Sequence, residues 1–239
     1  MKELIRLNKY LSSVGACSRR DGDRFIDEGR IFVNGQKAEK GMKVTGDEKI
    51  TIDGNPIAKA DEKVMLAYYK PRGIVCSTKN QGHEHNNIVD EINYPIRVYP
   101  VGRLDKDSEG LILMTNDGEI VNELLRARNG HEKEYEVTCD KEVSDADIVE
   151  MRKGGLELVE GRISKACKIR RTGAKSFNCI LTEGINRQIR RMCEHFGYEV
   201  TRLKRIRFMN IELDGLKVGE YREIPDYKEK LYGGKSFKR

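Results

Sequence analysis

Three acidic side chains lie within five positions of the segment VGRLDKDSEG, which spans residues 101–110. These are Asp105, Asp107 and Glu109, and the basic residues Arg103 and Lys106 lie among them. The segment could bind a divalent cation, form a solvated loop, or hold one reactive carboxylate that a neighbouring group orients. A metal site is the least favoured of the three, because the flanking residues are basic and no second acidic motif has the spacing of a metallonuclease.

A strongly basic segment lies further along the chain, at TEGINRQIRRMCEHFGYEV, residues 182–200. Its spacing predicts a helix over residues 185–196, with apolar side chains on one face and Arg187, Arg190 and Arg191 on another. Residues 184–207 contain seven Lys and Arg against two Glu. Like charges on one helix face repel each other, so the pattern favours a nucleic-acid backbone as the partner. Pairing to acids elsewhere in the protein is the alternative.

The elements that must position these residues indicate an α+β domain. Strands are predicted at VMLAYY, IVCST, HEKEYEVTCD, KACKIRRT, KSFNCILTEG and RIRFMNIEL. Helices are predicted over residues 118–128, 144–153 and 185–196. Because strands dominate and helices are scattered between them, the pattern indicates a mixed, mainly antiparallel sheet flanked by helices.

A smaller module precedes this domain, in the order helix, helix, short strands. The stretch IRLNKYLSSVG has helical spacing, and Ser18 is expected to cap a second helix that Gly29 ends. The stretch RIFVNGQKA alternates apolar and polar residues up to Asn34-Gly35, which predicts a hairpin turn. Arg19 and Arg20 at the start of the second helix favour an anionic partner, with a solvated basic surface as the alternative.

Composition shifts predict the domain boundaries. Residues 1–52 form the small module, and the glycine, proline and charges that follow indicate a linker over residues 53–62. The larger domain is expected over residues 63–232, with a mobile tail at 233–239. No apolar run is long enough to cross a membrane and the first residues lack a signal-peptide pattern, so a cytoplasmic protein, monomeric by default, is expected. The six cysteines form no CxxC pair, and no metal site is expected from them.

Four segments together resemble a known family. GRLDKDSEGLILMTNDG is similar to the signature of pseudouridine synthases of the RsuA-type branch. HEKEYEV and TEGINRQIRRMCEHFGYEVTRLKRIR resemble the other two motifs of that branch, in the same order. RLNKYLSSVGACSRRDGDRFIDEGRIFVNG resembles the small RNA-binding domain named after ribosomal protein S-four. Within the branch the chain most resembles the pseudouridine synthases of the F type, which act on 23S RNA of the large ribosomal subunit.

The resemblance implies site-specific isomerisation of uridine to pseudouridine in ribosomal RNA, without a cofactor. The target nucleotide would be flipped out of its stack before the bond between base and ribose is rearranged. Asp105 would be the catalytic carboxylate, Tyr135 would stack on the flipped ring and assist proton transfer at carbon 5, and Leu203 would lie beneath the base. The basic partner of Asp105 matches Arg190 best, with Arg187 as the second choice.

The expected partner is RNA, with neither a membrane nor a small-molecule cofactor. The residues expected to contact RNA are Arg6, Lys9, Arg19, Arg20, Asn34, Arg103, Lys133, Asn186, Arg187, Gln188, Arg191 and Leu203. The segment KPRG, residues 70–73, is expected near the RNA, and the loop with His83, Glu84 and His85 indicates exposed recognition rather than metal binding. Two other functions stay open on the residues alone: a non-catalytic RNA-binding protein of ribosome assembly, and a metal-dependent nuclease that uses Asp105 and Asp107.

Overall fold

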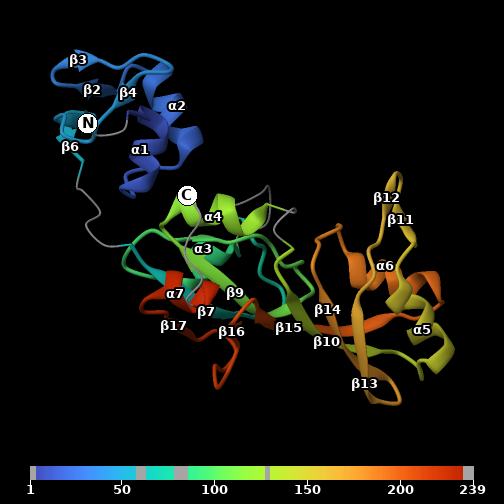
Figure 1. Cartoon of the computed structure of the whole chain (residues 1–239). Helices are drawn as coiled ribbons and strands as arrows, with labels where there is room; N and C mark the ends of the chain where they lie inside the picture. Colours follow the sequence, from blue (N-terminus) through green and yellow to red (C-terminus); the bar gives the residue numbers. More distant parts are fainter. Residues whose placement is uncertain (1–3, 58–62, 78–85, 127–129, 234–239) are drawn as a thin grey trace. The chain divides into compact units, whose positions relative to one another are not determined.

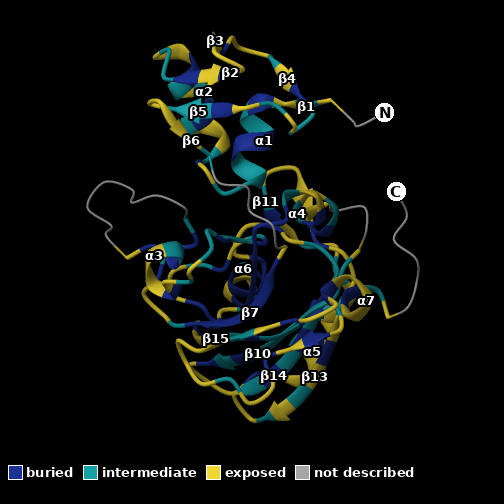
Figure 2. Ribbon diagram, turned by 90° about the vertical axis from the view of Figure 1, so that its left-hand side faces the viewer, coloured by how far each residue is buried: buried dark blue, intermediate teal, exposed yellow. Residues whose placement is uncertain are grey.

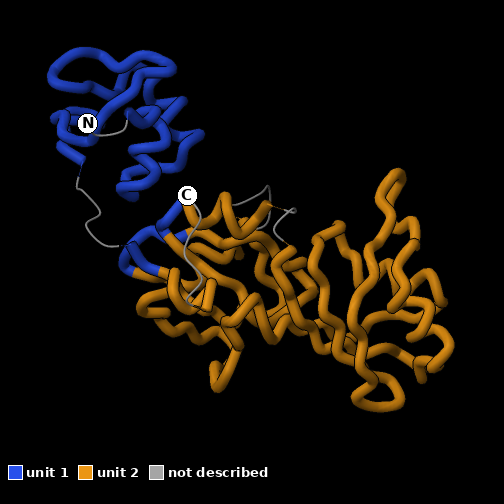
Figure 3. The backbone as a smooth tube through the Cα atoms, viewed as in Figure 1, with its two compact units in different colours: residues 1–64, 95–98, 116–118 blue, residues 65–94, 99–115, 119–239 orange. Residues whose placement is uncertain are grey.

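The computed structural model describes residues 4–57, 63–77, 86–126 and 130–233. Backbone contacts divide the chain into two compact units, which Figure 1 labels by element and Figure 3 colours separately. Unit 1 comprises residues 1–64, 95–98 and 116–118, and unit 2 comprises residues 65–94, 99–115 and 119–239. Three predictions lie outside the described residues: the linker from residue 58, the loop with His83, Glu84 and His85, and the tail from residue 234.

Unit 1 has the predicted order of two helices followed by short strands. Its elements are β1 (Ile5–Arg6), α1 (Leu7–Ser13), α2 (Arg19–Asp27), β2 (Ile31–Val33), β3 (Gln36–Lys37), β4 (Lys43–Val44), β5 (Ile50–Ile52) and β6 (Asn55–Pro56). Among the described residues, a four-stranded sheet has the order β3-β2-β5-β6, and β1 pairs with β4. Leu7, Leu11, Ile26 and Ile31 are buried between the helices and this sheet, so unit 1 has a hydrophobic core of its own.

The local signals that bound α2 and the hairpin are those that the sequence predicts. The Ser18 hydroxyl accepts a hydrogen bond from the Asp21 backbone N–H at 3.1 Å, a cap that stabilises a helix by about 1 kcal/mol. Gly29 follows the end of α2 in the left-handed region, with φ at +69°. Asn34 and Gly35 have φ values of 50° and 81°, which suit a two-residue turn between β2 and β3.

Unit 2 is an α+β domain built on one large sheet. Its helices are α3 (Ile88–Ile92), α4 (Gly118–Leu125), α5 (Asp145–Lys153), α6 (Gln188–His195) and α7 (Tyr227–Tyr232). Its strands are β7 (Met65–Lys70), β8 (Tyr99–Pro100), β9 (Glu109–Thr115), β10 (Lys133–Cys139), β11 (Glu157–Val159), β12 (Arg162–Ile163), β13 (Lys168–Gly173), β14 (Ser176–Leu181), β15 (Val200–Phe208), β16 (Ile211–Glu212) and β17 (Tyr221–Glu223). The residue Gly118 of α4 falls in unit 1.

The predicted mixed, mainly antiparallel sheet is confirmed. Within the described part of the chain its strand order is β13-β14-β10-β15-β9-β7-β17, with β16 added to β15 and β8 added to β9. The β15–β9 pair is parallel and the other described pairs of this sheet are antiparallel. The parallel pair joins the strand after the acidic segment to the strand after the basic helix, so the fold brings the two motifs together.

Two hydrophobic cores support the two ends of the sheet. One packs Ile148 of α5 and Met192 of α6 against Phe177 of β14, and the other packs Ile120 of α4 and Leu231 of α7 against β7 and β9. Figure 1 shows α5 and α6 at the β13–β14 end and α4 and α7 at the β7–β17 end. Figure 2 shows that α6 and β7 are largely buried. The strand β15 contributes Leu203 to the first core and Phe208 to the second, so it connects the two.

Several details of unit 2 differ from the prediction. The strand expected at IVCST is absent from the described residues except for a single bridge between Val75 and Asn87. The strand expected at RIRFMNIEL is interrupted at Met209, whose φ of 52° ends β15 and begins a turn into β16. The central strand β9 is not among the predicted strands, because its segment EGLILMT has no alternation of apolar and polar residues.

Candidate active site

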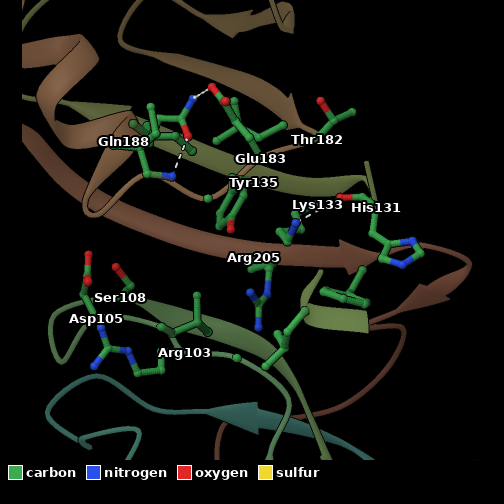
Figure 4. A pocket seen from close by; sticks show the side chains of 18 of the residues that line it. Arg103, Asp105, Ser108, His131, Lys133, Tyr135, Thr182, Glu183, Gln188 and Arg205 are labelled. Atoms are coloured by element: carbon green, nitrogen blue, oxygen red, sulfur yellow. Dashed lines mark hydrogen bonds between the residues drawn. The ribbon is translucent and has the colours of Figure 1, made fainter. Parts of the chain in front are cut away.

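A pocket of about 530 Å³ opens on unit 2 where the acidic and basic motifs meet. Its walls come from the loop before β9, from β10, from β15, from α4 and from the segment that leads into α6. Figure 4 shows Asp105 on one side of the pocket, Lys133, Arg205 and His131 toward the other, and the ring of Tyr135 between Asp105 and Lys133. The fold thus brings side chains that are far apart in the sequence to one cavity.

Asp105 lies in the loop directly before β9, and several backbone interactions fix this loop. The fully buried ammonium group of Lys70, at the end of β7, donates hydrogen bonds to the carbonyl oxygens of Ser108 at 2.8 Å and of Pro71 at 2.7 Å. The Gly73 N–H donates to the carbonyl oxygen of Lys106 at 2.8 Å. These hydrogen bonds fix the backbone of the loop, while the Asp105 side chain stays 31% exposed toward the pocket.

The sequence did not predict that Lys70 has a structural role beneath the loop of Asp105. The KPRG segment is expected beside RNA, but the Lys70 side chain lies under the Asp105 loop, and burial lowers its pKa from the ordinary value. A signal was present in the sequence, since Lys70 directly continues the apolar run of a fully buried strand. A buried ammonium group needs several acceptors, and backbone carbonyls supply them here.

Arg187 is the arginine that pairs with Asp105. Its Nη1 atom lies 3.8 Å from Asp105 Oδ2, and the two side chains are 39% and 31% exposed. Arg187 precedes α6 in the left-handed conformation, with φ at 54°. The contact is made by Arg187, the second choice of the sequence analysis, and not by Arg190, the first choice, and the catalytic role of either arginine stays a prediction. The helix starts later than the apolar periodicity suggests, which turns Arg187 out of the helix and toward the loop.

Arg190 is buried and binds the backbone instead of the carboxylate. Its Nη1 donates to the Val200 carbonyl at 2.8 Å, and its Nη2 makes long contacts of 3.4 Å to the Asp107 carbonyl and the Ser108 hydroxyl. Burial, followed by the nearby charge of Arg187, lowers the pKa of Arg190. Arg190 therefore links α6, β15 and the loop of Asp105, and it does not lie on an exposed basic face.

Tyr135 and Leu203 lie on the same face of the sheet, as the prediction of a base-stacking pocket requires. On adjacent strands Tyr135 pairs with Arg205 and Val137 pairs with Leu203, and all but Val137 line the pocket. A register shift between Glu134 and Tyr135 interrupts the regular pairing of the two strands at this point. Such irregularities re-aim side chains beside active sites, and here the shift lets Tyr135 point into the cavity.

The far end of the pocket is cationic. Lys133 donates a hydrogen bond to the His131 carbonyl at 3.0 Å, and Arg205 donates from Nε to the Leu111 carbonyl at 2.6 Å. Burial, followed by the charge of Arg205, lowers the pKa of Lys133 to about 8. Burial and the charge of Lys133 also lower the pKa of His131. Arg205 is not among the predicted site residues, although strand alternation places it on the face of Leu203.

The remaining residues predicted to bind RNA fall into two groups. Arg6, Arg19, Arg20, Arg103 and Asn186 are exposed, and Lys9 is half-buried, so their RNA contacts stay predictions. Three others have structural partners. Asn34 accepts from the Lys49 N–H at 2.8 Å, Gln188 is buried and donates to Glu183 at 2.7 Å, and Arg191 donates to the Leu158 carbonyl at 2.9 Å.

No group of three or more His, Cys, Asp or Glu side chains in the described residues is placed to hold a metal ion. The cysteines among the described residues are free thiols, and five of the six are buried. No helix in the same part of the chain is both long enough and apolar enough to span a bilayer.

Comparisons with known proteins place this geometry in a family. The family model described as RNA pseudouridylate synthase matches residues 64–195, and the S4 domain model matches residues 5–50. A dual-specificity RNA pseudouridine synthase, RluF of Salmonella typhi, is 48% identical over 223 residues, which cover 92% of this chain and 76% of that relative. The chain belongs to the RNA pseudouridine synthase family. The synthase is therefore an isomerase that converts uridine to pseudouridine in RNA.

Further relatives support the same assignment for this synthase. The ribosomal large subunit pseudouridine synthase B of Bacillus subtilis is 36% identical over 233 residues, which cover 94% of both chains. A solved structure described as a pseudouridylate synthase has a TM-score of 0.69 and 26% identity, and the match covers 95% of this chain and 99% of that one. Because these matches extend over both units, the predicted combination of an S4 domain with a synthase domain is confirmed.

Proposed function

We propose that this synthase isomerises one uridine of large-subunit ribosomal RNA, in the 23S species, with Asp105 as the catalytic carboxylate. The single observation that carries the assignment of the site is the pocket that holds Asp105, its partner Arg187 at 3.8 Å and the ring of Tyr135 together. The choice of ribosomal RNA is supported by the similarity to the large-subunit synthase B. The assignment of the residues' roles rests on this geometry and on the motifs.

The reaction breaks the bond between N1 of uracil and C1′ of ribose and forms a bond between C5 and C1′. The proton on C5 leaves, N1 is protonated, and the product has the same atoms as the substrate. No external oxidant, reductant or cofactor is required for this balance. The Asp105 carboxylate meets the positive charge that develops at C1′, as nucleophile or as ionic partner, and Arg187 orients that carboxylate.

The base must leave its stack to enter such a pocket. A flipped uracil would stack on the ring of Tyr135, with Leu203 as an apolar support below it. Tyr135 then also lies near C5, where it assists the proton transfer. Leu203 is 7% exposed and Asp105 is 31% exposed, so the apolar support is buried while the carboxylate is open to the pocket.

The organisation of the chain extends the proposal. We place the RNA-binding module at residues 1–52, the linker at 53–62, the synthase domain at 63–232 and a tail at 233–239. The module would bind RNA through Arg19 and Arg20, which are exposed at the N-terminus of α2. We further propose that the synthase acts in the cytoplasm, where ribosomal RNA is modified, and as a monomer.

Mapping pseudouridines in total RNA from cells that lack this protein tests the proposed function. One uridine of 23S ribosomal RNA should lose its modification in these cells and regain it when the wild-type chain is expressed. Expression of Asp105→Asn at the same level should not restore it. An unchanged pseudouridine map would contradict the proposal, and a lost site in another RNA class would contradict the choice of substrate.

A further inference from the structure

The cationic end of the pocket lacks the acidic partners that other basic residues of the same strand have. On β15 the side chains of Arg202, Lys204 and Arg207 each pair with a glutamate, at 2.7 Å to Glu109, at 3.3 Å to Glu136 and at 2.9 Å to Glu134. Arg205, on the same strand, forms no ion pair with any described residue, and neither does Lys133 on β10. Lys133 and Arg205 therefore line the pocket without an ion-pair partner among the described residues.

The guanidinium group of Arg205 also has an unused donor. Arg205 is 3% exposed, its Nε is bonded to the Leu111 carbonyl, and its buried Nη2 atom has no hydrogen-bond partner among the described residues. Buried donors are nearly always satisfied, because an unmade hydrogen bond in a desolvated place costs free energy. Since Arg205 lines the pocket, a bound ligand is the partner that this atom can still obtain.

The geometry of this end favours one ligand chemistry. Lys133 and Arg205 lie close enough for the arginine to lower the pKa of the lysine, and both cations stand over the ring of Phe208, at 5.6 Å and 5.7 Å from its centroid. A neutral base edge would satisfy donors but would leave two desolvated positive charges uncompensated. A phosphodiester offers acceptor oxygens together with a negative charge, which an arginine and a lysine bind with strong, charge-assisted hydrogen bonds.

We propose that Lys133 and Arg205 form a subsite for one phosphodiester of the RNA, at the end of the pocket opposite Asp105. The subsite holds the backbone next to the target nucleotide while the flipped base lies between Tyr135 and Asp105. This inference rests on the proposed function, because it needs RNA in the pocket. His131 supplies the carbonyl that anchors Lys133, and the buried Nε2 of its ring has no hydrogen-bond partner among the described residues.

The test uses synthetic RNA hairpins of the mapped 23S segment, each with one backbone linkage replaced by a neutral methylphosphonate. Binding is measured with the full chain carrying Asp105→Asn, so that no turnover intervenes. One linkage at or next to the target uridine should weaken binding at least about tenfold when it is neutral. Adding Lys133→Met should abolish the difference between this hairpin and the unmodified one.

Lys153→Met is the matched control, because Lys153 is exposed on α5 and pairs with Glu150 at 2.6 Å. It should leave the tenfold difference intact. Arg205→Lys, which keeps the charge, provides a second test if its melting temperature equals that of the parent, and it should reduce the difference. The subsite is refuted if no single linkage is sensitive, or if Lys133→Met leaves the same difference.

The outcomes separate the subsite from the proposed function. Wild-type enzyme that forms no pseudouridine in the unmodified hairpin, or in the intact 23S RNA, contradicts the function itself. Wild-type enzyme that forms pseudouridine while the neutral linkages have no effect contradicts only the subsite.

Discussion

The ion pair between Asp105 and Arg187 contributes little to the stability of the fold. Both side chains are about a third exposed, and ion pairs of this kind stabilise a fold by roughly 0–1 kcal/mol. Arg190, by contrast, is 7% exposed and its Nη1 donates to the Val200 carbonyl. The two arginines lie in one motif, close together in the sequence, yet they have different tasks.

Arg187→Met and Arg190→Met should therefore affect different properties of the protein, catalysis in the first variant and stability in the second. Loss of Arg187 should lower kcat by about 10²-fold, as expected when one preorganised charge is removed from an active site, with little change in melting temperature. Loss of Arg190 should reduce the free energy of unfolding by about 1–3 kcal/mol, since it leaves the Val200 carbonyl unsatisfied. Single-turnover kinetics and thermal unfolding of both variants measure this contrast. Equal losses of stability in the two variants would refute the division of roles.

Lys133 should make RNA binding depend on pH in the alkaline range. Its pKa is lowered to about 8 by burial and by Arg205, and its other close neighbours are His131, whose pKa is also lowered, and Phe208. Lys133 is charged below pH 8 and neutral above it, so affinity should decrease as the pH rises through about 8. Lys133→Arg should keep its affinity up to about pH 9.5, because a guanidinium stays protonated there. An identical pH profile for the wild type and this variant would contradict the assignment.

The lowered pKa of Lys133 also makes the free energy of unfolding depend on pH. Lys133 in the unfolded chain has the ordinary pKa of 10.5, so the unfolded state binds more protons than the folded state between about pH 8 and 10.5. The lysine's contribution to the free energy of unfolding is thus least favourable below pH 8 and improves as the pH rises through this window. The affinity and the stability should change in opposite directions.

At the scale of elements, the junction between β9 and β15 determines where Asp105 lies. Gly110 pairs with Arg205 across the parallel strands, and its φ is +105°. A Cβ atom at this position would lie 2.7 Å from the Arg205 backbone nitrogen and in contact with the Arg205 carbonyl oxygen. Because the obstacle is backbone, it has no side chain to move aside, so only glycine permits this approach.

Gly110→Ala should unfold or severely destabilise unit 2. Gly215→Ala is the matched control, since Gly215 also has a positive φ, of +69°, but nothing lies within 4 Å of the Cβ position. The control should lower Tm by about 2–8 °C through backbone strain alone, and Gly110→Ala should lower it by clearly more. Circular dichroism melts of the two variants make the comparison. Equal Tm values would show that the close approach does not constrain the fold.

Sequence patterns predicted the elements that have strong local signals. The cap at Ser18 and the turn at Asn34-Gly35 involve neighbouring residues only, so their geometry follows from short-range hydrogen bonds and φ preferences. The helix at α6 was predicted from its apolar face. In contrast, β9 is buried along its whole length and shows no alternation, so periodicity alone does not distinguish it.

The site could be predicted in part, because some of its residues lie in recognisable motifs and others depend on the folded structure. The motifs gave Asp105, Tyr135 and Leu203, and the structure places all three on one pocket. The choice between Arg187 and Arg190 depended on the residue at which α6 begins, and helix boundaries are weakly encoded. The prediction of Arg205 as a site residue would require knowing that it has no acidic partner among the described residues. Spacing along the chain does not reveal this.

At the scale of the whole molecule, the net charge of +6 is distributed over both units, so RNA affinity should depend strongly on salt. Arg19 and Arg20 are exposed at the start of α2, where the helix dipole also favours anions. If both contact phosphates, the variant Arg19→Ala with Arg20→Ala should reduce the slope of log K against log salt by roughly 1.5–2. Binding to 23S RNA fragments at several salt concentrations measures the slope.

A control variant makes that measurement specific. Replacing Arg30, which is paired with Asp53 in the same unit, with alanine should leave the slope nearly unchanged. An unchanged slope in the double variant would show that the N-terminal end of α2 does not contact the RNA backbone.

The catalytic role of Asp105 is tested most directly by comparing the wild type with Asp105→Asn on 23S ribosomal RNA, with pseudouridine formation and RNA affinity measured in parallel. Asparagine keeps the shape of the side chain but removes its negative charge. Turnover should fall at least about 10³-fold while the Kd for RNA stays within about twofold. Equal rates of pseudouridine formation in the two proteins would contradict the catalytic role, because the carboxylate beside Arg187 would then have no part in the reaction.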